Sequence, residues 1–177
     1  MSLHSFFESL QNIGFLTDIR ESALVYPVIL STHLLAIALF GGMILMTDLR
    51  ILGLGMKDKT ISEVVNGTRI PKRIGLVIIV TCGLLLFSSE ALKYEPNPFF
   101  WTKITLLILA ITHYFVFRGS IYNNPEALDK MPVLPSKVKA GAVLSLVIWT
   151  AIPVMGRLIA YYEPDKEKAP TTQTATR

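Results

Sequence analysis

The sequence predicts an all-α integral membrane protein, a four-helix bundle with a short N-terminal interfacial helix. Composition is the first reason. Hydrophobic residues make up 51% of the 177-residue chain and charged residues only 17%, and the mean hydropathy is +0.50. The charges cluster between apolar blocks, as they do in membrane proteins. The second reason is length, because four of these blocks can span a hydrocarbon core of about 30 Å.

The four apolar segments expected to cross the bilayer run over 23–47, 74–92, 100–117 and 138–161. A buried helix of a soluble protein would not recur four times at this length. We therefore expect one transmembrane domain over 23–162. The remaining residues, 163–177, are polar and lack aromatic side chains, so we expect a disordered tail.

Residues 1–22 are expected to form a separate amphipathic segment before the first span. The stretch lacks the basic region that opens a cleavable signal peptide. Ser5 and Glu8 have the spacing of a capping box. Apolar side chains then recur with helical spacing, at Phe6, Phe7, Leu10, Ile13 and Phe15. This pattern is typical of a helix lying at the membrane interface, and a frayed terminus is the alternative.

The distribution of basic residues predicts the topology. Lys and Arg gather in the loops before the second and fourth spans, which lie on the same side of a four-span protein. Because cytoplasmic loops are rich in Lys and Arg, both termini are expected in the periplasm of a bacterium, with the chain in the inner membrane. Aromatic residues fall at the predicted outer ends: Tyr26, Tyr94, Phe99, Phe100, Trp101, Tyr161 and Tyr162.

Other features of composition restrict the partners. The lipid bilayer is the first partner that the spans imply. No basic stripe alternates with aromatic residues, so we expect no nucleic-acid partner. Cys82 is the single cysteine, which excludes a disulfide within the chain.

Two histidines lie inside predicted spans, His33 in the first and His113 in the third. Polar residues in a hydrocarbon interior are rare and often functional. His33 lies about ten residues inward from the outer end of its span and His113 about thirteen, an offset of about 5 Å. Helix tilt absorbs an offset of that size. The sequence therefore predicts two imidazoles at similar depth on separate helices.

A haem iron takes two such imidazoles as axial ligands. A b-type haem between His33 and His113 is therefore the leading hypothesis, for electron transfer or for oxidation of a membrane-soluble substrate. The alternatives are hydrogen bonds across helices that fix packing, or a proton relay. Zinc and copper lack acidic or cysteine ligands at this depth, although Met43, Met46 and Met155 leave a soft copper site open.

Three charged residues are expected one or two turns inside the outer boundary, namely Glu90, Lys103 and Arg157. A cation at such a depth needs a partner or must reach the interface. Lys103 and Arg157 are therefore candidate partners for outward-pointing haem propionates. The alternative is a structural bridge from Glu90 to one of the two cations.

The inner ends of the spans carry no assigned chemistry. Arg50, in the segment DLRILGLG at 48–55, is interpreted as an anchor that favours the inner side. Lys72 is counted with the basic loop before the second span, and Pro71 suits the first turn of that span. Residues 123–130 predict a short capped turn of helix.

A family resemblance is carried by THLLAIALFGGMILMTDLRILGL, FWTKITLLILAITHYFVF and SLVIWTAIPVMGRLIAYY. These stretches resemble an uncharacterised family of small bacterial four-helix membrane proteins and, more distantly, CopD-like and HemJ-like membrane proteins. HemJ-like proteins bind b-type haem and oxidise protoporphyrinogen, which is what the resemblance implies here. The residues in similar places are His33, Gly41, Gly42, Trp101, Lys103 and His113. The chain departs from that pattern at 48–55 and in the loops, so the sequence leaves open whether it is an enzyme.

The alternative function is a non-haem membrane component. Such a component would be a small transporter, a copper-uptake subunit or an accessory subunit of a larger membrane complex. The haem hypothesis instead implies a redox partner.

Overall fold

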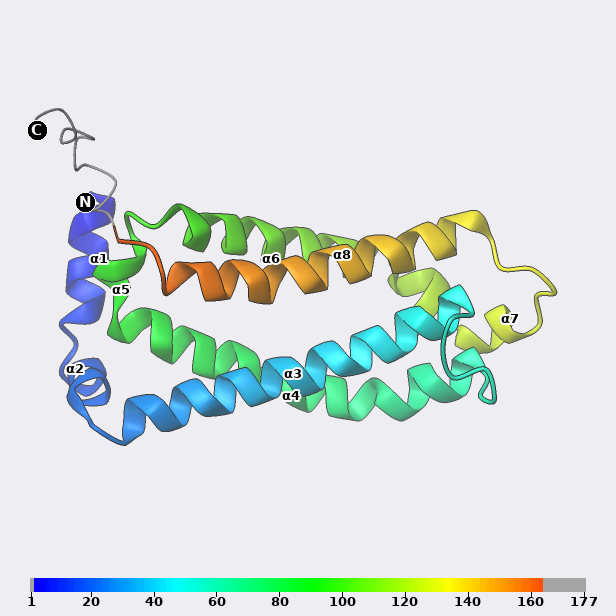
Figure 1. Ribbon diagram of the computed structural model, residues 1–177, viewed down its shortest axis with the longest axis horizontal. Coiled ribbons are helices and arrows are strands. Elements are labelled where there is room, and N and C mark those ends of the chain that lie inside the picture. The colour runs from blue at the N-terminus through cyan, green and yellow to red at the C-terminus, as the bar shows by residue number, and fades with distance from the viewer. Residues whose placement is uncertain (1, 164–177) are drawn as a thin grey trace, which may run out of the picture.

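Four long helices lie side by side along the long axis of the computed structural model (Figure 1). They are α3 (Val25–Leu52), α4 (Ile61–Ser89), α6 (Pro98–Phe117) and α8 (Ser136–Ile159). Each is long and apolar enough to cross a membrane. The structure describes residues 2–163, over which every regular element is helical, and this confirms the predicted fold class. The expected tail, apart from Glu163, lies outside the described residues.

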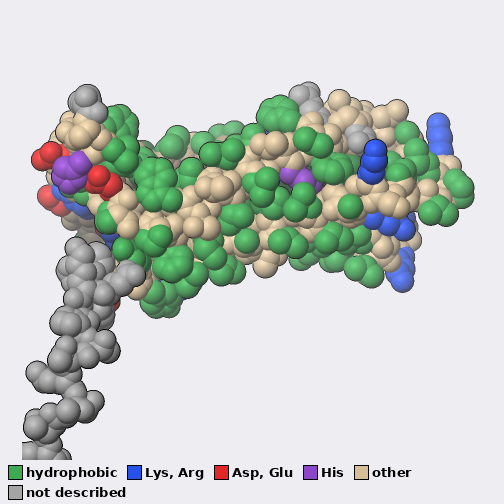
Figure 2. Space-filling view, turned by 90° about the horizontal axis from the view of Figure 1, so that it is seen from above, with side chains coloured by type: hydrophobic (Ala, Val, Ile, Leu, Met, Phe, Trp, Pro, Cys, Tyr) green, Lys and Arg blue, Asp and Glu red, His purple; other side chains and the backbone are tan. Residues whose placement is uncertain are grey.

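Short helices occupy the two ends of the bundle. The end at which α1 begins and α8 ends in Figure 1, which we call the terminal end, carries α1 (Leu3–Gln11), α2 (Gly14–Glu21) and α5 (Ala91–Tyr94). The opposite end carries the π-helical turn η1 (Arg118–Tyr122) and α7 (Pro125–Asp129). On the face shown in Figure 2, Lys and Arg side chains stand out at this second end, which we call the basic end. The side chains between the two ends are largely hydrophobic, as lipid contact requires.

The N-terminal segment forms two helices where the sequence predicted one. Helix α1 begins at Leu3, and the Ser2 side chain caps it by accepting the N–H of Ser5. The predicted Ser5–Glu8 capping box is therefore wrong, because Ser5 already lies in the first turn. On the inner face of α1, Phe7 is buried and meets Phe87 of α4 edge-on at 5.6 Å between ring centroids. The segment thus docks on the bundle through one apolar face.

Helix α4 begins at Ile61, thirteen residues before the predicted second span. Thr60 and Glu63 form a capping box at this end. Beyond the cap, one face of the helix is buried at helical spacing: Ile61, Val64, Val65 and Thr68. Pro71 therefore lies inside the helix, which corrects its expected place in the first turn. Lys72 lies inside the helix as well.

Helix α7 supports the start of α4 from outside. The two carboxylate oxygens of Asp129 accept the N–H groups of Ile61 at 2.7 Å and of Ser62 at 3.2 Å. A carboxylate at a helix N-terminus satisfies unpaired donors and complements the helix dipole. The expected turn at 123–130 is present as α7, and its role is to hold the basic end of α4.

Replacing Asp129 with asparagine should destabilise this junction by about 1 kcal/mol at pH 7. Burial alone would raise the pKa of Asp129, but the hydrogen bonds from Ser62 and Ile61 hold that pKa below its usual range. A depressed pKa stabilises the fold above the unfolded value, near pH 4, and this stabilisation is lost as the pH falls through the folded value. Thermal unfolding in detergent at pH 7 and near pH 3 measures the effect, with Asp58→Asn in the neighbouring loop as control. Equal loss of stability in both variants would contradict the assignment.

The long helices pack in a definite order. Helix α3 packs against α4 and α8, and α6 packs against α8. At the centre, the Phe40 ring of α3 lies 5.0 Å from the Trp149 ring of α8. The same side chain fills the space beside Gly75 of α4, where an added Cβ would lie 3.4 Å from the Phe40 Cβ. Residues of α3 and α6 therefore face each other mainly across the bundle rather than as neighbours.

Candidate functional site

Contacts between helices fix the depth of each polar residue. Near the terminal end, the Tyr26 hydroxyl of α3 donates to the Glu90 carboxylate at 3.0 Å. The Phe40 layer lies in the middle of the bundle. Towards the basic end, the Lys72 Nζ of α4 donates to the Thr47 hydroxyl of α3 at 2.6 Å. Residue numbers in α3 therefore measure depth from the terminal end to the basic end.

His33 lies in the terminal half, between Tyr26 and Phe40. Its ring is buried, with 8% of the residue exposed, and it packs against α4 beside Gly83 and the backbone of Ile79. A Cβ on Gly83 would lie only 3.1 Å from the His33 Cε1 atom. Within residues 2–163, the Nδ1 atom of His33 has no hydrogen-bond partner. A buried ring nitrogen without a partner is uncommon and calls for a physical explanation.

Lys103 lies at the same depth on α6. Its Nζ atom lies next to Gly156 of α8, 3.6 Å from where a Cβ would be, and its charge acts on His33. No hydrogen bond or ion pair to Lys103 is formed in the described part of the chain. An unpaired ammonium inside a span is costly unless an anion joins it. The fold therefore brings two of the predicted residues together, and we call His33, Gly83, Lys103 and Gly156 the terminal-half site.

His113 has a different environment. Its Nε2 atom donates to the Gly141 carbonyl of α8 at 2.9 Å, and its ring centroid lies 4.7 Å from that of Phe117. Because a carbonyl only accepts hydrogen bonds, Nε2 must carry the proton and is not free to bind a metal. This is the packing role that was the alternative for His113.

The two histidines do not lie at similar depth. The Gly141 carbonyl is one helical turn beyond Ser145, which lies beside Asp48 of α3. Asp48 is itself fifteen residues, or about 22 Å, along α3 from His33. One metal ion would need both ring nitrogens within about 4 Å, twice a metal–nitrogen bond. The estimate of equal depth is wrong because it assumed that the outer ends of the two spans lie level, whereas the contacts of His33 with Gly83 and of His113 with Gly141 place the two rings at different depths.

The contact at Gly141 allows a direct test of the His113 environment. A Cβ at Gly141 would lie 2.5 Å from the Phe117 Cε1 atom, which forces the ring away from His113. Replacing Gly141 with alanine should therefore destabilise the α6–α8 pair by about 1–3 kcal/mol. Unfolding in detergent measures this, with Gly42→Ala as control because nothing lies within 4 Å of the corresponding Cβ. Equal stability of the two variants would contradict the contact.

The predicted ring of charges at the terminal end is arranged otherwise than expected. Arg157 donates to the Tyr161 hydroxyl at 2.7 Å, and its guanidinium lies 4.9 Å from the centre of that ring. Glu90 accepts from Lys93 at 3.0 Å as well as from Tyr26. The expected bridge from Glu90 to Arg157 or Lys103 is thus wrong. Arg157 is exposed and lies outside the terminal-half site.

A second polar cluster lies in the basic half, and the sequence analysis missed it. Asp48 of α3 is 2% exposed, and its Oδ2 atom has no hydrogen-bond partner in the described residues. The charge of Lys72 acts on it across the α3–α4 contact, and Ser145 of α8 lies beside it. We call Asp48 and Lys72 the basic-half pair. The feature of the sequence that could have revealed this cluster is Asp48 itself, which lies one residue beyond the predicted end of the first span.

The described residues contain no group of three His, Cys, Asp or Glu side chains placed to hold a metal ion. A family model described as "Family of unknown function (DUF6644)" matches residues 6–162. This bears out the expected membership of an uncharacterised family. No curated protein and no solved structure matches the chain, and the likeness to CopD-like and HemJ-like proteins stays a prediction.

Proposed function

The chain belongs to the DUF6644 family, whose function is unknown, and we propose that it binds a b-type haem at the terminal-half site. One observation carries this proposal. The buried Nδ1 atom of His33 and the Lys103 ammonium share one depth, and neither has a partner within residues 2–163. An imidazole and a cation are the two groups that a haem needs, one for the iron and one for a propionate.

The residues of this site fit a haem in part. His33 would supply one axial nitrogen, and Lys103 would hold a propionate towards the terminal end. Gly83 leaves room for the His33 ring and Gly156 for the Lys103 side chain, so the two glycines position the two groups. Two further residues expected to take part are not included in this proposal, because His113 lies at the depth of Gly141 and Arg157 is exposed and bonded to Tyr161. We therefore propose a single protein histidine ligand in place of the expected pair.

A bound haem supplies one-electron chemistry, which suits electron transfer or oxidation of a membrane-soluble substrate. The chain itself binds and orients the group and surrounds it with hydrocarbon. By the positive-inside rule, the basic end would face the cytoplasm of a bacterium. The terminal-half site, with both termini, would then lie on the periplasmic side of the inner membrane.

A difference spectrum tests the proposal. The protein is expressed with added haem precursor, purified in mild detergent and measured reduced minus oxidised. We expect a stoichiometric b-type α band that His33→Ala abolishes and His113→Ala leaves in place. Lys103→Met should weaken haem binding about tenfold or more, because a charge-assisted hydrogen bond is lost.

Three outcomes would overturn the proposal: no α band in the unaltered protein, a band unchanged in His33→Ala, or a band lost equally in His113→Ala. Metal analysis of the same samples covers the alternative. One equivalent of copper without haem would favour the non-haem transporter or copper-uptake function. The spectrum and the metal analysis together therefore distinguish the haem hypothesis from the copper hypothesis for His33.

A further inference from the structure

Asp48 is a buried acid whose hydrogen bonds are incomplete. It is 2% exposed, and its Oδ2 atom lacks any partner among residues 2–163. A buried carboxylate normally accepts several hydrogen bonds or contacts a cation directly. Asp48 forms no ion pair within 4.0 Å in the described chain, although the charge of Lys72 acts on it. One oxygen of this acid is therefore left without a donor inside the bundle.

Lys72 links this acid to the surroundings of the bundle. Its Nζ atom donates to the Thr47 hydroxyl at 2.6 Å, one residue from Asp48. Its side chain is only half-buried, whereas Thr47 and Asp48 are fully buried. The ammonium is thus held one residue from the carboxylate, at the end of a side chain that is partly exposed.

Polar groups from several elements lie near Asp48. Besides Thr47 and Lys72, Ser145 of α8 lies beside the carboxylate. The Tyr122 ring of η1 lies 5.7 Å from the Lys72 Nζ atom, and Asp48 acts on it electrostatically. Tyr114 of α6 contacts that ring in turn. Isolated π-helical turns such as η1 are frequent at functional sites.

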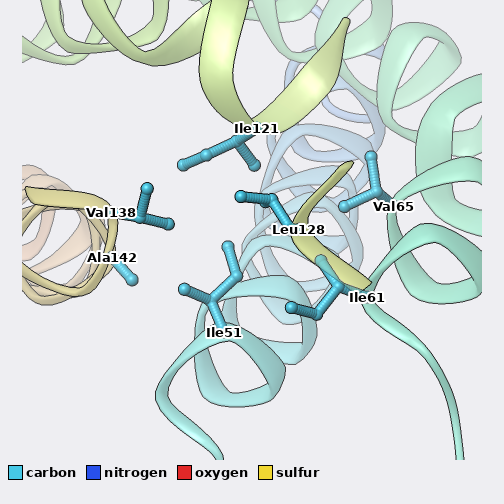
Figure 3. Packing of buried hydrophobic residues seen from close by; sticks show 7 residues of the cluster. All are labelled: Ile51, Ile61, Val65, Ile121, Leu128, Val138 and Ala142. Carbon is cyan, nitrogen blue, oxygen red and sulfur yellow. The ribbon is translucent and has the colours of Figure 1, made fainter. Parts of the chain in front are cut away.

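An apolar plug closes the bundle on the basic side of this cluster. Figure 3 shows its side chains pointing towards one another from α3, α4, η1, α7 and α8, namely Ile51, Ile61, Val65, Ile121, Leu128, Val138 and Ala142. The plug begins one turn beyond Asp48 on α3. On the other side, the Phe40–Trp149 layer separates Asp48 from the terminal-half site. Among the described neighbours of Asp48, Lys72 is a charged side chain that is partly exposed at the surface of the bundle.

We propose that Asp48 is a proton-exchange site in the basic half of the membrane, with Lys72 as its fixed counter-charge. Uptake breaks one O–H bond of a hydronium ion that reaches the side chain of Lys72, and forms one O–H bond at Oδ2, leaving water. Release breaks the bond at Oδ2 and returns the proton to a water molecule, and no electron is transferred. The proposal does not depend on haem binding, because the two clusters lie about 22 Å apart along α3.

Infrared difference spectroscopy of the whole protein in lipid vesicles tests this proposal. A protonated carboxylic acid has a carbonyl band that a carboxylate lacks, and the band shifts when the acid exchanges with D₂O. Between about pH 4 and pH 10, we expect one such band to appear and disappear and to shift in D₂O. Asp48→Asn should remove it, Asp48→Glu should keep it at a changed midpoint, and Asp58→Asn in the exposed loop should leave it unaltered.

Two results of this experiment would overturn the proposal for Asp48. The absence of any band sensitive to Asp48→Asn would show that Asp48 stays ionised, and the proposal would fall. A band that neither titrates nor shifts in D₂O would show a locked acid, which also overturns it. Asp48→Glu keeps the test valid if the asparagine variant does not fold.

Discussion

Replacing Lys72 with methionine should lower the free energy of unfolding by about 3–5 kcal/mol. At a pH where Asp48 is ionised, the variant leaves this buried carboxylate without a compensating cation among its described neighbours, because Ser145 is neutral. Breaking a buried charge pair from one side costs more than the pair itself is worth. Unfolding by titration with denaturing detergent, followed by circular dichroism, measures the loss.

The matched control is Arg73→Met, since Arg73 is exposed and follows Lys72 on the same helix. We expect it to change stability by no more than about 0.5 kcal/mol. The double variant Asp48→Asn/Lys72→Met removes both charges and should recover most of the loss. A double variant as unstable as Lys72→Met would show that Lys72 stabilises the fold through Thr47 alone.

The membrane helices were predictable because each apolar segment of the sequence is long. A hydrocarbon core needs about 20 apolar residues from each helix, so errors at single positions do not change the outcome. The start of α4 was missed for the opposite reason. Residues 61–73 are amphipathic, and their helix depends on Thr60, Glu63 and the distant Asp129 carboxylate rather than on hydropathy.

The candidate site was predictable in its residue types and not in its pairings. His33 and Lys103 were identified because polar groups are rare in spans. Which residues meet depends on how far each helix is shifted along its neighbour. Close packing at glycines, such as Gly83 beside His33 and Gly141 beside Phe117, sets that shift. Hydropathy carries no information on it, so two histidines that lie about 20 Å apart along the bundle were expected at similar depth.

The basic-half pair was missed because the end of the first span and the start of the second were both placed short of these residues, by less than one turn. The predicted first span ended at residue 47, and Lys72 was assigned to a loop. One further helical turn at each of these two ends would have placed Asp48 and Lys72 within two consecutive spans. Adjacent antiparallel helices bring such residues together. The physical signal was therefore an acid and a base near the facing ends of consecutive helices.

Replacing Asn97 with alanine should destabilise the terminal end by about 2–4 kcal/mol. Asn97 is 1% exposed and joins α6 to α8 there. Its Nδ2 atom donates to the Ile159 carbonyl at 3.1 Å, and its Oδ1 atom accepts the Phe99 N–H at 3.0 Å and the Phe100 N–H at 3.4 Å. Alanine would leave a buried carbonyl and the first donors of α6 without partners.

Serine at position 97 separates the two contributions. It can still cap α6 but cannot reach Ile159, so Asn97→Ser should recover about 1 kcal/mol relative to alanine. Asn123→Ala, at an exposed asparagine, is the control for unfolding in detergent. Because Asn97 holds the start of α6 against the end of α8, its loss should also loosen Lys103 beside Gly156. We therefore expect Asn97→Ala to weaken haem binding at the terminal-half site while leaving the Asp48 carbonyl band unchanged. A change of both signals together would show that the two halves of the bundle are coupled.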